Sequence, residues 1–175
     1  MGASHRIDLE RFVPFRLNRL AAEVSRALGR VYGERFGIDI PEWRVIAMLG
    51  DRGRARAQDI ALSTRMHKSM VSRAVARLME LGWVARTANA GDRREAPLAL
   101  TPGGCEVYAR LVPIVLDYQD RLLTSLTARE RRMLDRLLDK LERQLDLPCR
   151  PARPEPPGRG VAAALPEPAS AAPGS

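Results

Sequence analysis

The sequence has few of the side chains on which catalytic and metal sites depend. It contains two cysteines, two histidines and only 5% aromatic residues. Cys105 and Cys149 lie far apart in the chain, so they form neither a CxxC zinc motif nor a disulfide framework. Neither His5 nor His67 has a nucleophile and an orienting acid at local spacing, and there is no glycine-rich phosphate loop. We therefore expect no catalytic residues, no metal site and no cofactor.

Long apolar runs are also missing. No run approaches the roughly 18–20 residues that a helix needs to span a bilayer. The first residues do not show the charged and then apolar layout of a secretory signal. We expect a cytoplasmic protein that has no membrane contact.

Lysine is rare, but positive charge is not. There are 29 basic residues against 21 acidic ones, a net charge of +8, and all but two of the bases are arginine. Ten bases and three acids fall between Arg52 and Arg94, so nearly all of the excess lies in one quarter of the chain. A local patch of this kind attracts a polyanion, either nucleic acid or an anionic membrane surface.

The chain divides into a body and a tail. Residues 148–175 hold eight of the 13 prolines, mixed with Ala, Gly and Ser, and almost no large apolar side chain. Such a segment buries too little surface to offset its ordering entropy, so we predict a disordered tail. In the body, apolar residues recur every three or four positions, which predicts long helices near 14–36, 102–122 and 127–145.

Shorter helices are predicted between the long ones. Pro41 suits the first turn of a short helix, and Gly50 is placed to end it. A second short helix ends near Thr64. A third runs over residues 68–81 and stops at Gly82.

A hairpin is predicted after the third short helix. Residues 83–87 have strand composition, residues 88–92 have turn chemistry, and residues 95–100 can return as the partner strand. Pro97 argues for an edge position, since proline cannot donate to a ladder. A two-stranded hairpin among helices has the shape of a wing.

The predicted helix over residues 68–81 has two different faces. At about 100° per residue, one arc carries Val71, Ala74, Val75, Leu78 and Met79. The opposite arc carries Ser69, Met70, Arg73, Ala76, Arg77 and Glu80, with Ser72 at the border. Small side chains let a helix lie close to base edges, and arginine binds guanine or phosphate in a bidentate manner. This face is typical of a DNA-recognition helix, although an ordinary amphipathic surface helix gives the same pattern by itself.

Several motifs in the right order resemble the MarR family of winged-helix transcriptional regulators. The stretch from Thr64 to Arg73, followed by residues 78–82, is similar to the turn and recognition helix of that family. Asp92-Arg93-Arg94, followed after five residues by Leu100-Thr101, is similar to its wing signature. Residues 12–17 and 41–45 also resemble the family, and the likeness covers about residues 9–145.

Two positions depart from the family pattern. His67 stands where an Asp or Ser cap is usual, which predicts a weaker or pH-sensitive helix start. Cys105 stands where arginine is more common. The family includes thiol sensors, but nothing near either cysteine marks it as reactive.

The resemblance implies a mainly α fold, a winged helix-turn-helix with a two-stranded β wing and with N- and C-terminal dimerisation helices. Residues 1–40 and 102–147 would form the dimerisation region, and residues 41–101 would bind DNA. It implies a homodimeric, sequence-specific regulator of transcription, most often a repressor, that a small aromatic or phenolic ligand releases. Two recognition helices would enter successive major grooves of a near-palindromic double-stranded operator, with each wing reaching a minor groove.

The residues expected to contact DNA are Arg54, Lys68, Ser69, Met70, Ser72, Arg73, Arg77, Asp92, Arg93 and Arg94. The resemblance favours Arg94 as the residue inserted into the minor groove and Asp92 as the residue that orients an arginine. The residues expected to line an effector cleft between the dimerisation and DNA-binding regions are Phe12, Phe15, Arg16, Trp43 and Arg44. For any single one of these five, a place in the core or in solvent is the simpler interpretation.

A different class of function fits part of the pattern. The amphipathic helices could bind a protein partner while the arginine patch coats DNA without sequence preference. A footprint over one short palindrome would exclude such an architectural module, and uniform coating would support it.

Overall fold

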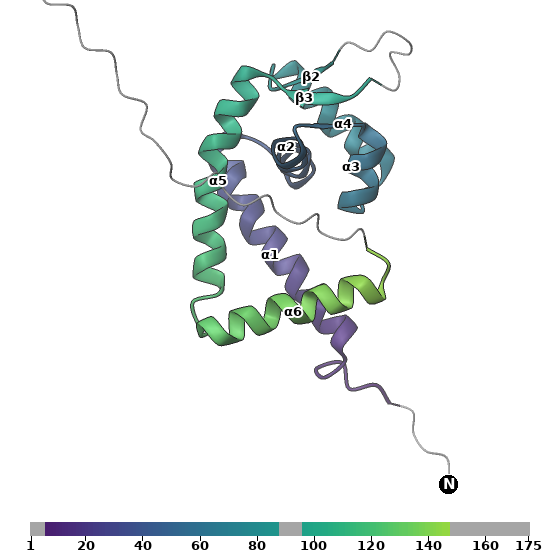
Figure 1. Cartoon of the computed structure of the whole chain (residues 1–175), viewed down its shortest axis with the longest axis vertical. Helices are drawn as coiled ribbons and strands as arrows, with labels where there is room; N and C mark the ends of the chain where they lie inside the picture. The colour runs from purple at the N-terminus through teal and green to yellow at the C-terminus, as the bar shows by residue number, and fades with distance from the viewer. Residues whose placement is uncertain (1–5, 88–95, 148–175) are drawn as a thin grey trace, which may run out of the picture. The chain divides into compact units, whose positions relative to one another are not determined.

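The structure, a computed structural model, describes residues 6–87 and 96–147. These residues are mainly helical and include a small antiparallel sheet (Figure 1). They fall into two compact units, divided between Leu134 and Asp135. The elements in chain order are α1 (Val13–Phe36), α2 (Ile40–Arg52), β1 (Arg54–Ala55), α3 (Ala57–Thr64), α4 (Lys68–Glu80), β2 (Val84–Arg86), β3 (Leu98–Leu100), α5 (Pro102–Leu122) and α6 (Ala128–Gln144). The predicted disordered tail lies outside the described residues.

The long helices begin and end as their sequence signals predict. Pro14 lies in the first turn of α1, and Gly37 ends this helix in the left-handed conformation at φ 64°. The Thr101 side chain accepts a hydrogen bond from the Gly104 N–H at the start of α5. Thr127 and Glu130 form the expected reciprocal cap before α6. These ends are determined by contacts within a few residues, which is why the sequence reveals them.

Gly50 does not end α2, and that prediction is wrong. The helix continues to Arg52 and is capped by Gly53, whose φ of 73° favours glycine. Gly50 is required for a different reason, because a Cβ built on it would lie 2.4 Å from the ring of Tyr108 on α5. The small residue therefore lets α2 and α5 approach each other.

The sheet has three strands rather than the predicted two, in the order β1-β3-β2. Residue Arg54 of β1 pairs with Ala99, and Ala85 of β2 pairs with the same residue from the other side. β3 is therefore the central strand, and the edge position predicted from Pro97 is wrong. Pro97 immediately precedes the strand. It needs no N–H there, because its carbonyl oxygen accepts a hydrogen bond from the Thr87 N–H at 2.8 Å. The mainly α winged-helix class itself is confirmed.

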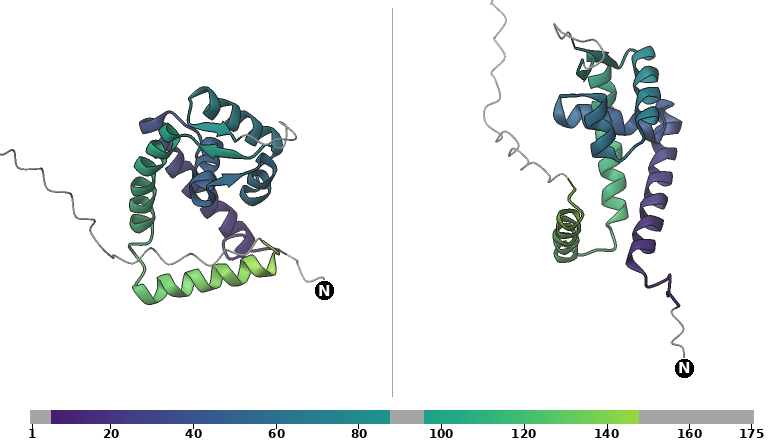
Figure 2. Two further views of the ribbon diagram at one scale, coloured as in Figure 1. Left: turned by 45° about the horizontal axis from the view of Figure 1, so that its top comes forward. Right: turned by 90° about the vertical axis from the view of Figure 1, so that its right-hand side faces the viewer.

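The hydrophobic core belongs to the middle of the chain. α2 packs against α4 and α5, α3 packs against α4, and α1 contacts α2 and α5 (Figure 2). The largest fully buried side chains are Tyr32, Val45, Ile46, Leu49, Ile60, Val71, Leu78, Leu98 and Leu111. α6 contributes no buried residue. None of the helices within the described residues combines the length and apolar character needed to cross a membrane.

Two neighbouring glycines at the start of α5 should respond very differently to alanine. A Cβ on Gly104 would lie 2.0 Å from the carbonyl oxygen of Trp83, a backbone atom that cannot rotate away. A Cβ on Gly103 would meet nothing closer than the Thr101 hydroxyl at 3.9 Å. We expect Gly104→Ala to lower the free energy of unfolding by about 3 kcal/mol, and Gly103→Ala to leave it unchanged or to raise it slightly. Urea denaturation followed by circular dichroism measures both, and equal effects would contradict the close contact.

Tyr32 predicts a specific response to alkaline pH. Its side chain is 1% exposed and stacks on Trp43 with 5.8 Å between ring centroids. Burial raises the pKa of Tyr32 to about 12, with Arg44 opposing and Asp39 adding to the shift. The neutral phenol is thus favoured in the folded state, so its contribution to stability is complete below pH 10 and is lost as the pH rises toward 12. The difference between the ultraviolet titrations of wild type and Tyr32→Phe should show a tyrosine that ionises near pH 12; a difference that appears near pH 10 would contradict this prediction.

Candidate nucleic-acid interface

The N-terminal end of α4 has an unusual cap. The Nδ1 atom of His67 accepts a hydrogen bond from the Ser69 N–H at 3.3 Å and lies 2.8 Å from the Ser69 hydroxyl. His67 therefore occupies the cap position that the sequence assigned to it, with its imidazole in place of a carboxylate or hydroxyl. An imidazole cap, unlike a carboxylate, adds no negative charge at the helix end that would face phosphates.

The two faces of α4 lie as the helical wheel predicts. Val71, Ala74, Val75 and Leu78 are buried. The opposite face, with Ser69, Met70, Ser72, Arg73, Ala76, Arg77 and Glu80, is exposed. Met79 is the exception, because its side chain remains 38% exposed rather than entering the core. α4 therefore rests on α2 and α3 by one stripe and presents the other to its surroundings.

The two exposed arginines of α4 differ in their surroundings. Arg77 forms an ion pair with Glu80, 3.4 Å from Nη1 to Oε2, on an exposed surface where such pairs contribute little. Arg73 has no ion pair or hydrogen bond with any described residue. Both line a cavity of about 310 Å³, whose other side is lined by the cap residue Asp39 and the first turn of α2.

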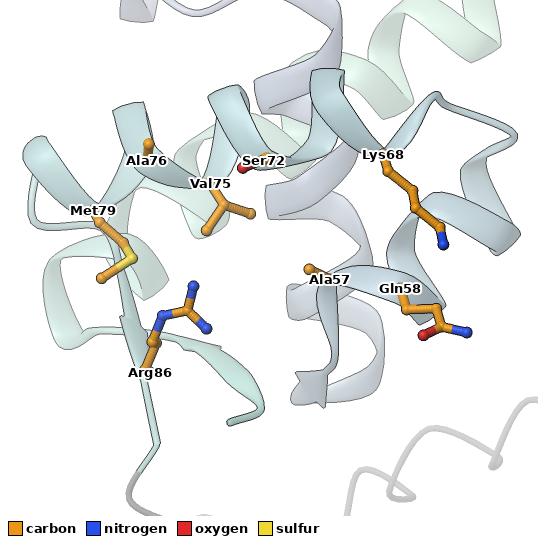
Figure 3. Close-up of a pocket in the computed structure, with 8 residues that line it drawn as sticks. All are labelled: Ala57, Gln58, Lys68, Ser72, Val75, Ala76, Met79 and Arg86. Atoms are coloured by element: carbon orange, nitrogen blue, oxygen red, sulfur yellow. The ribbon is translucent and has the colours of Figure 1, made fainter. Parts of the chain in front are cut away.

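A second cavity, of about 360 Å³, lies between α3, α4 and β2 (Figure 3). Arg86 extends from β2 toward Met79 of α4, while Gln58 and Lys68 lie toward the other end of the cavity. Sequence reasoning missed Arg86 and Gln58 as site residues. The only signal for Arg86 was its place in the basic stretch, since the contact of β2 with α4 is tertiary.

Of the other predicted DNA contacts, one lies on β1, one lies on α4, and three lie outside the described residues. Arg54 is exposed on β1, at the edge of the sheet. Lys68 is exposed at the first position of α4. The wing-tip residues Asp92, Arg93 and Arg94 lie outside the described residues. The basic side chains that the structure describes in this region therefore come from two strands of the small sheet, β1 and β2, and from α4.

The five residues predicted to line an effector cleft are not brought together within one chain. Phe15 and Arg16 lie in the first turns of α1, and Phe12 immediately precedes that helix. All three are exposed. Trp43 and Arg44 are half-buried on α2, where Trp43 stacks on Tyr32 near the other end of α1. At about 1.5 Å per residue, Phe15 and Tyr32 are roughly 25 Å apart along the axis of α1.

Metal ligands do not gather in the part of the chain that the structure describes. No three side chains of His, Cys, Asp or Glu there lie close enough together to hold a metal ion. Cys105 is exposed in the first turns of α5. Apart from the Glu80 carboxylate, the polar side chains exposed on α4, β1 and β2 are guanidinium, ammonium and hydroxyl groups. These groups bind phosphates and the polar edges of bases.

Comparison with known proteins agrees with this geometry. Residues 36–95, which include most of the buried core residues, match the model of the MarR family. The HTH-type transcriptional regulator PecS of Dickeya dadantii is 26% identical over 132 residues, which cover 74% of this chain and 79% of PecS. An HTH-type transcriptional repressor of Mycobacterium tuberculosis is 29% identical over 122 residues, which cover 70% of this chain and 84% of the repressor. The crystal structure of a MarR/EmrR family transcriptional regulator from Acinetobacter sp. ADP1 superposes with a TM-score of 0.73 and 28% identity, covering 80% of this chain and 99% of that one.

Proposed function

We propose that this chain is a winged helix-turn-helix transcriptional regulator of the MarR family, whose model and members it resembles, and that it is a homodimeric repressor of one near-palindromic operator. Residues 41–101 bind double-stranded DNA, and residues 1–40 and 102–147 form the dimer. A small aromatic or phenolic ligand releases the protein from DNA. The observation that carries the proposal is the exposed face of α4.

That face combines small side chains with two exposed arginines, of which Arg77 pairs with Glu80 and Arg73 does not. Ser69 and Ala76 keep the helix surface low, so that the backbone can come close to base edges in a major groove. Arg73 forms no ion pair with the described residues. DNA can therefore bind its guanidinium without first breaking an ion pair within the chain. Residues 60–79 contain four bases and no acid, which favours approach to phosphates.

The distribution of exposed apolar side chains supports a dimer. Among the described residues, all but three of the exposed large hydrophobic side chains lie outside the proposed DNA-binding region. They are Ile7, Leu9, Phe12, Val13, Phe15, Leu17, Leu20, Leu116, Leu122, Met133, Leu137, Leu138, Leu141 and Leu145. Exposed apolar surface on this scale is typical of a protein–protein interface. A second copy of the chain, with the same helices, would bury these faces symmetrically.

The wing completes the interface. We assign Arg94 to the minor groove beside the major groove that α4 enters, where a narrow A·T-rich stretch attracts arginine. Asp92 orients a neighbouring arginine by an ion pair. The β2 and β3 arms support this assignment, since β2 carries Arg86 against α4 and thereby sets the root of the wing beside that helix.

The effector cleft requires both subunits. Because Phe15 and Trp43 are far apart in one chain, a single small ligand can contact both sets of residues only where the first turns of α1 from one subunit meet α2 of the other. Phe12, Phe15 and Trp43 would offer ring faces, and Arg16 and Arg44 would pair with a phenolate or carboxylate.

Footprinting on the DNA upstream of the gene tests the proposal. We expect protection of one short palindrome and the loss of that protection when a phenolic acid is added. If each subunit neutralises about 4–6 phosphates, the logarithm of affinity should fall with the logarithm of salt concentration at a slope of about −7 to −11. Uniform coating of the duplex would instead support an architectural module, and no binding at low salt would refute the function.

A further inference from the structure

Arg65 has a backbone conformation that disfavours its own side chain. It ends α3 in the left-handed region, at φ 54° and ψ 30°. Besides it, only Asp146 has a positive φ among the described residues that are not glycine. In this region the Cβ of an L residue crowds the following carbonyl oxygen, so glycine is preferred.

The fold does not account for an arginine at this position. The cap uses only the backbone, since the Arg65 N–H bonds to the carbonyls of Ala61 and Leu62. The side chain is exposed, and it forms no hydrogen bond, ion pair or ring contact with the described residues. Glycine would make the same cap without strain. A strained position with a charged side chain and no internal partner indicates a partner outside the chain.

The position of Arg65 identifies the chemistry of that partner. Residues 65–67 form the turn between α3 and α4, and Lys68 begins the helix that carries the exposed arginines. The guanidinium therefore lies in the stretch of residues 60–79 that contains no acidic residue. A cation beside the first turn of a recognition helix is close to the wall of the groove which that helix enters, and this wall is phosphate.

We propose that Arg65 is a further DNA contact, which binds a backbone phosphate at the edge of the major groove occupied by α4. This inference rests on the proposed function. It assigns the turn a positioning role, because a phosphate contact sets how deeply and at what angle α4 enters the groove but reads no sequence. The left-handed backbone of Arg65 is unfavourable for an arginine, and the phosphate contact of its guanidinium would explain why glycine does not take its place.

Three variants of the full-length protein test the proposal. Arg65→Gly removes both the charge and the strain, Arg65→Asn removes the charge with a residue that tolerates this conformation, and Arg65→Lys keeps the charge. Arg129→Asn is the matched control, since it removes one exposed arginine from the first turn of α6, outside the winged-helix region. Melting temperature is measured for each, together with affinity for an operator duplex and a random duplex between 50 and 200 mM salt.

We expect Arg65→Gly to raise the melting temperature by about 2–4 °C while weakening binding. Arg65→Gly and Arg65→Asn should lose about tenfold in affinity on both duplexes, and the salt slope of the dimer should become shallower by about 2, since one phosphate contact is lost per subunit. Arg65→Lys and Arg129→Asn should bind within about threefold of wild type.

Each alternative result has a separate meaning. Wild-type affinity and salt slope in both uncharged variants would overturn the phosphate contact while leaving the proposed function intact. A loss on the operator alone would assign Arg65 to a base and also overturn it. A lower melting temperature in both Arg65→Gly and Arg65→Asn would show that the side chain serves the fold. Absence of duplex binding by the wild type would refute the proposed function and this inference together.

Discussion

Arg73→Ala should weaken binding to the operator by about 1–3 kcal/mol per half-site, or roughly 5- to 150-fold, and weaken binding to random DNA much less. Arg73 is exposed on α4 and has no ion pair with a described residue, so the guanidinium is available to form a bidentate contact with a guanine. Because the proposed dimer presents two such helices, the loss applies to both half-sites. Fluorescence anisotropy on the two duplexes at one salt concentration measures the difference.

Arg52→Ala provides the matched control for charge. Arg52 is an exposed arginine in the same basic stretch, but it ends α2 and is not part of α4. Its loss should affect operator and random duplexes by equal and small amounts. Identical losses on both duplexes for Arg73→Ala would make Arg73 a backbone contact and would move sequence recognition to other residues.

Placing aspartate at both Leu137 and Leu141 should convert the proposed dimer to a monomer. The two side chains lie one turn apart on α6 and are 49% and 43% exposed, so they contribute nothing to a core within the chain. Burying four new carboxylates in a symmetric interface is strongly unfavourable. The mass measured by light scattering should fall from about twice 19.4 kDa to 19.4 kDa. Operator affinity should fall by about 10²–10⁴-fold, because the second half-site no longer benefits from effective concentration.

The control for this pair is an exposed leucine of the winged-helix region. Leu62 on α3 is 59% exposed, and Leu62→Asp should leave the mass at that of a dimer. The cooperative unfolding of the core should survive in the double variant, since α6 supplies none of its buried residues. A double variant that still has the mass of two chains would refute α6 as part of the interface.

Helix ends show where sequence reasoning succeeds and where it fails. Gly37 and Gly82 were expected to follow helices, and both have the positive φ that glycine permits. The sequence predicts an end for α2 at Gly50, but the helix ends at Gly53 instead. The choice depends on Tyr108, which lies far along the chain and packs where a Cβ on Gly50 would be. A local signal identifies a possible end, and a distant contact selects one of them.

The recognition surface was likewise predicted in part. The 3.6-residue period separated the faces of α4, so Arg73 and Arg77 were placed correctly on its exposed side. Met79 was placed in the core because its neighbours along the helix are buried. Its exposure is instead set by the open cavity between α4 and β2. The predicted contact residues 92–94 stay predictions.

By itself the sequence determined the helices, most of their ends, the polar face of α4 and the concentration of positive charge, because each of these depends on residues within one or two turns of one another. Only the tertiary structure decided that Arg54 and Ala55 form a third strand, that Arg86 joins α4, and that Phe15 and Trp43 lie far apart in one chain. A strand of two residues has no detectable alternation. It exists because β3, more than forty residues later, supplies its hydrogen-bond partners.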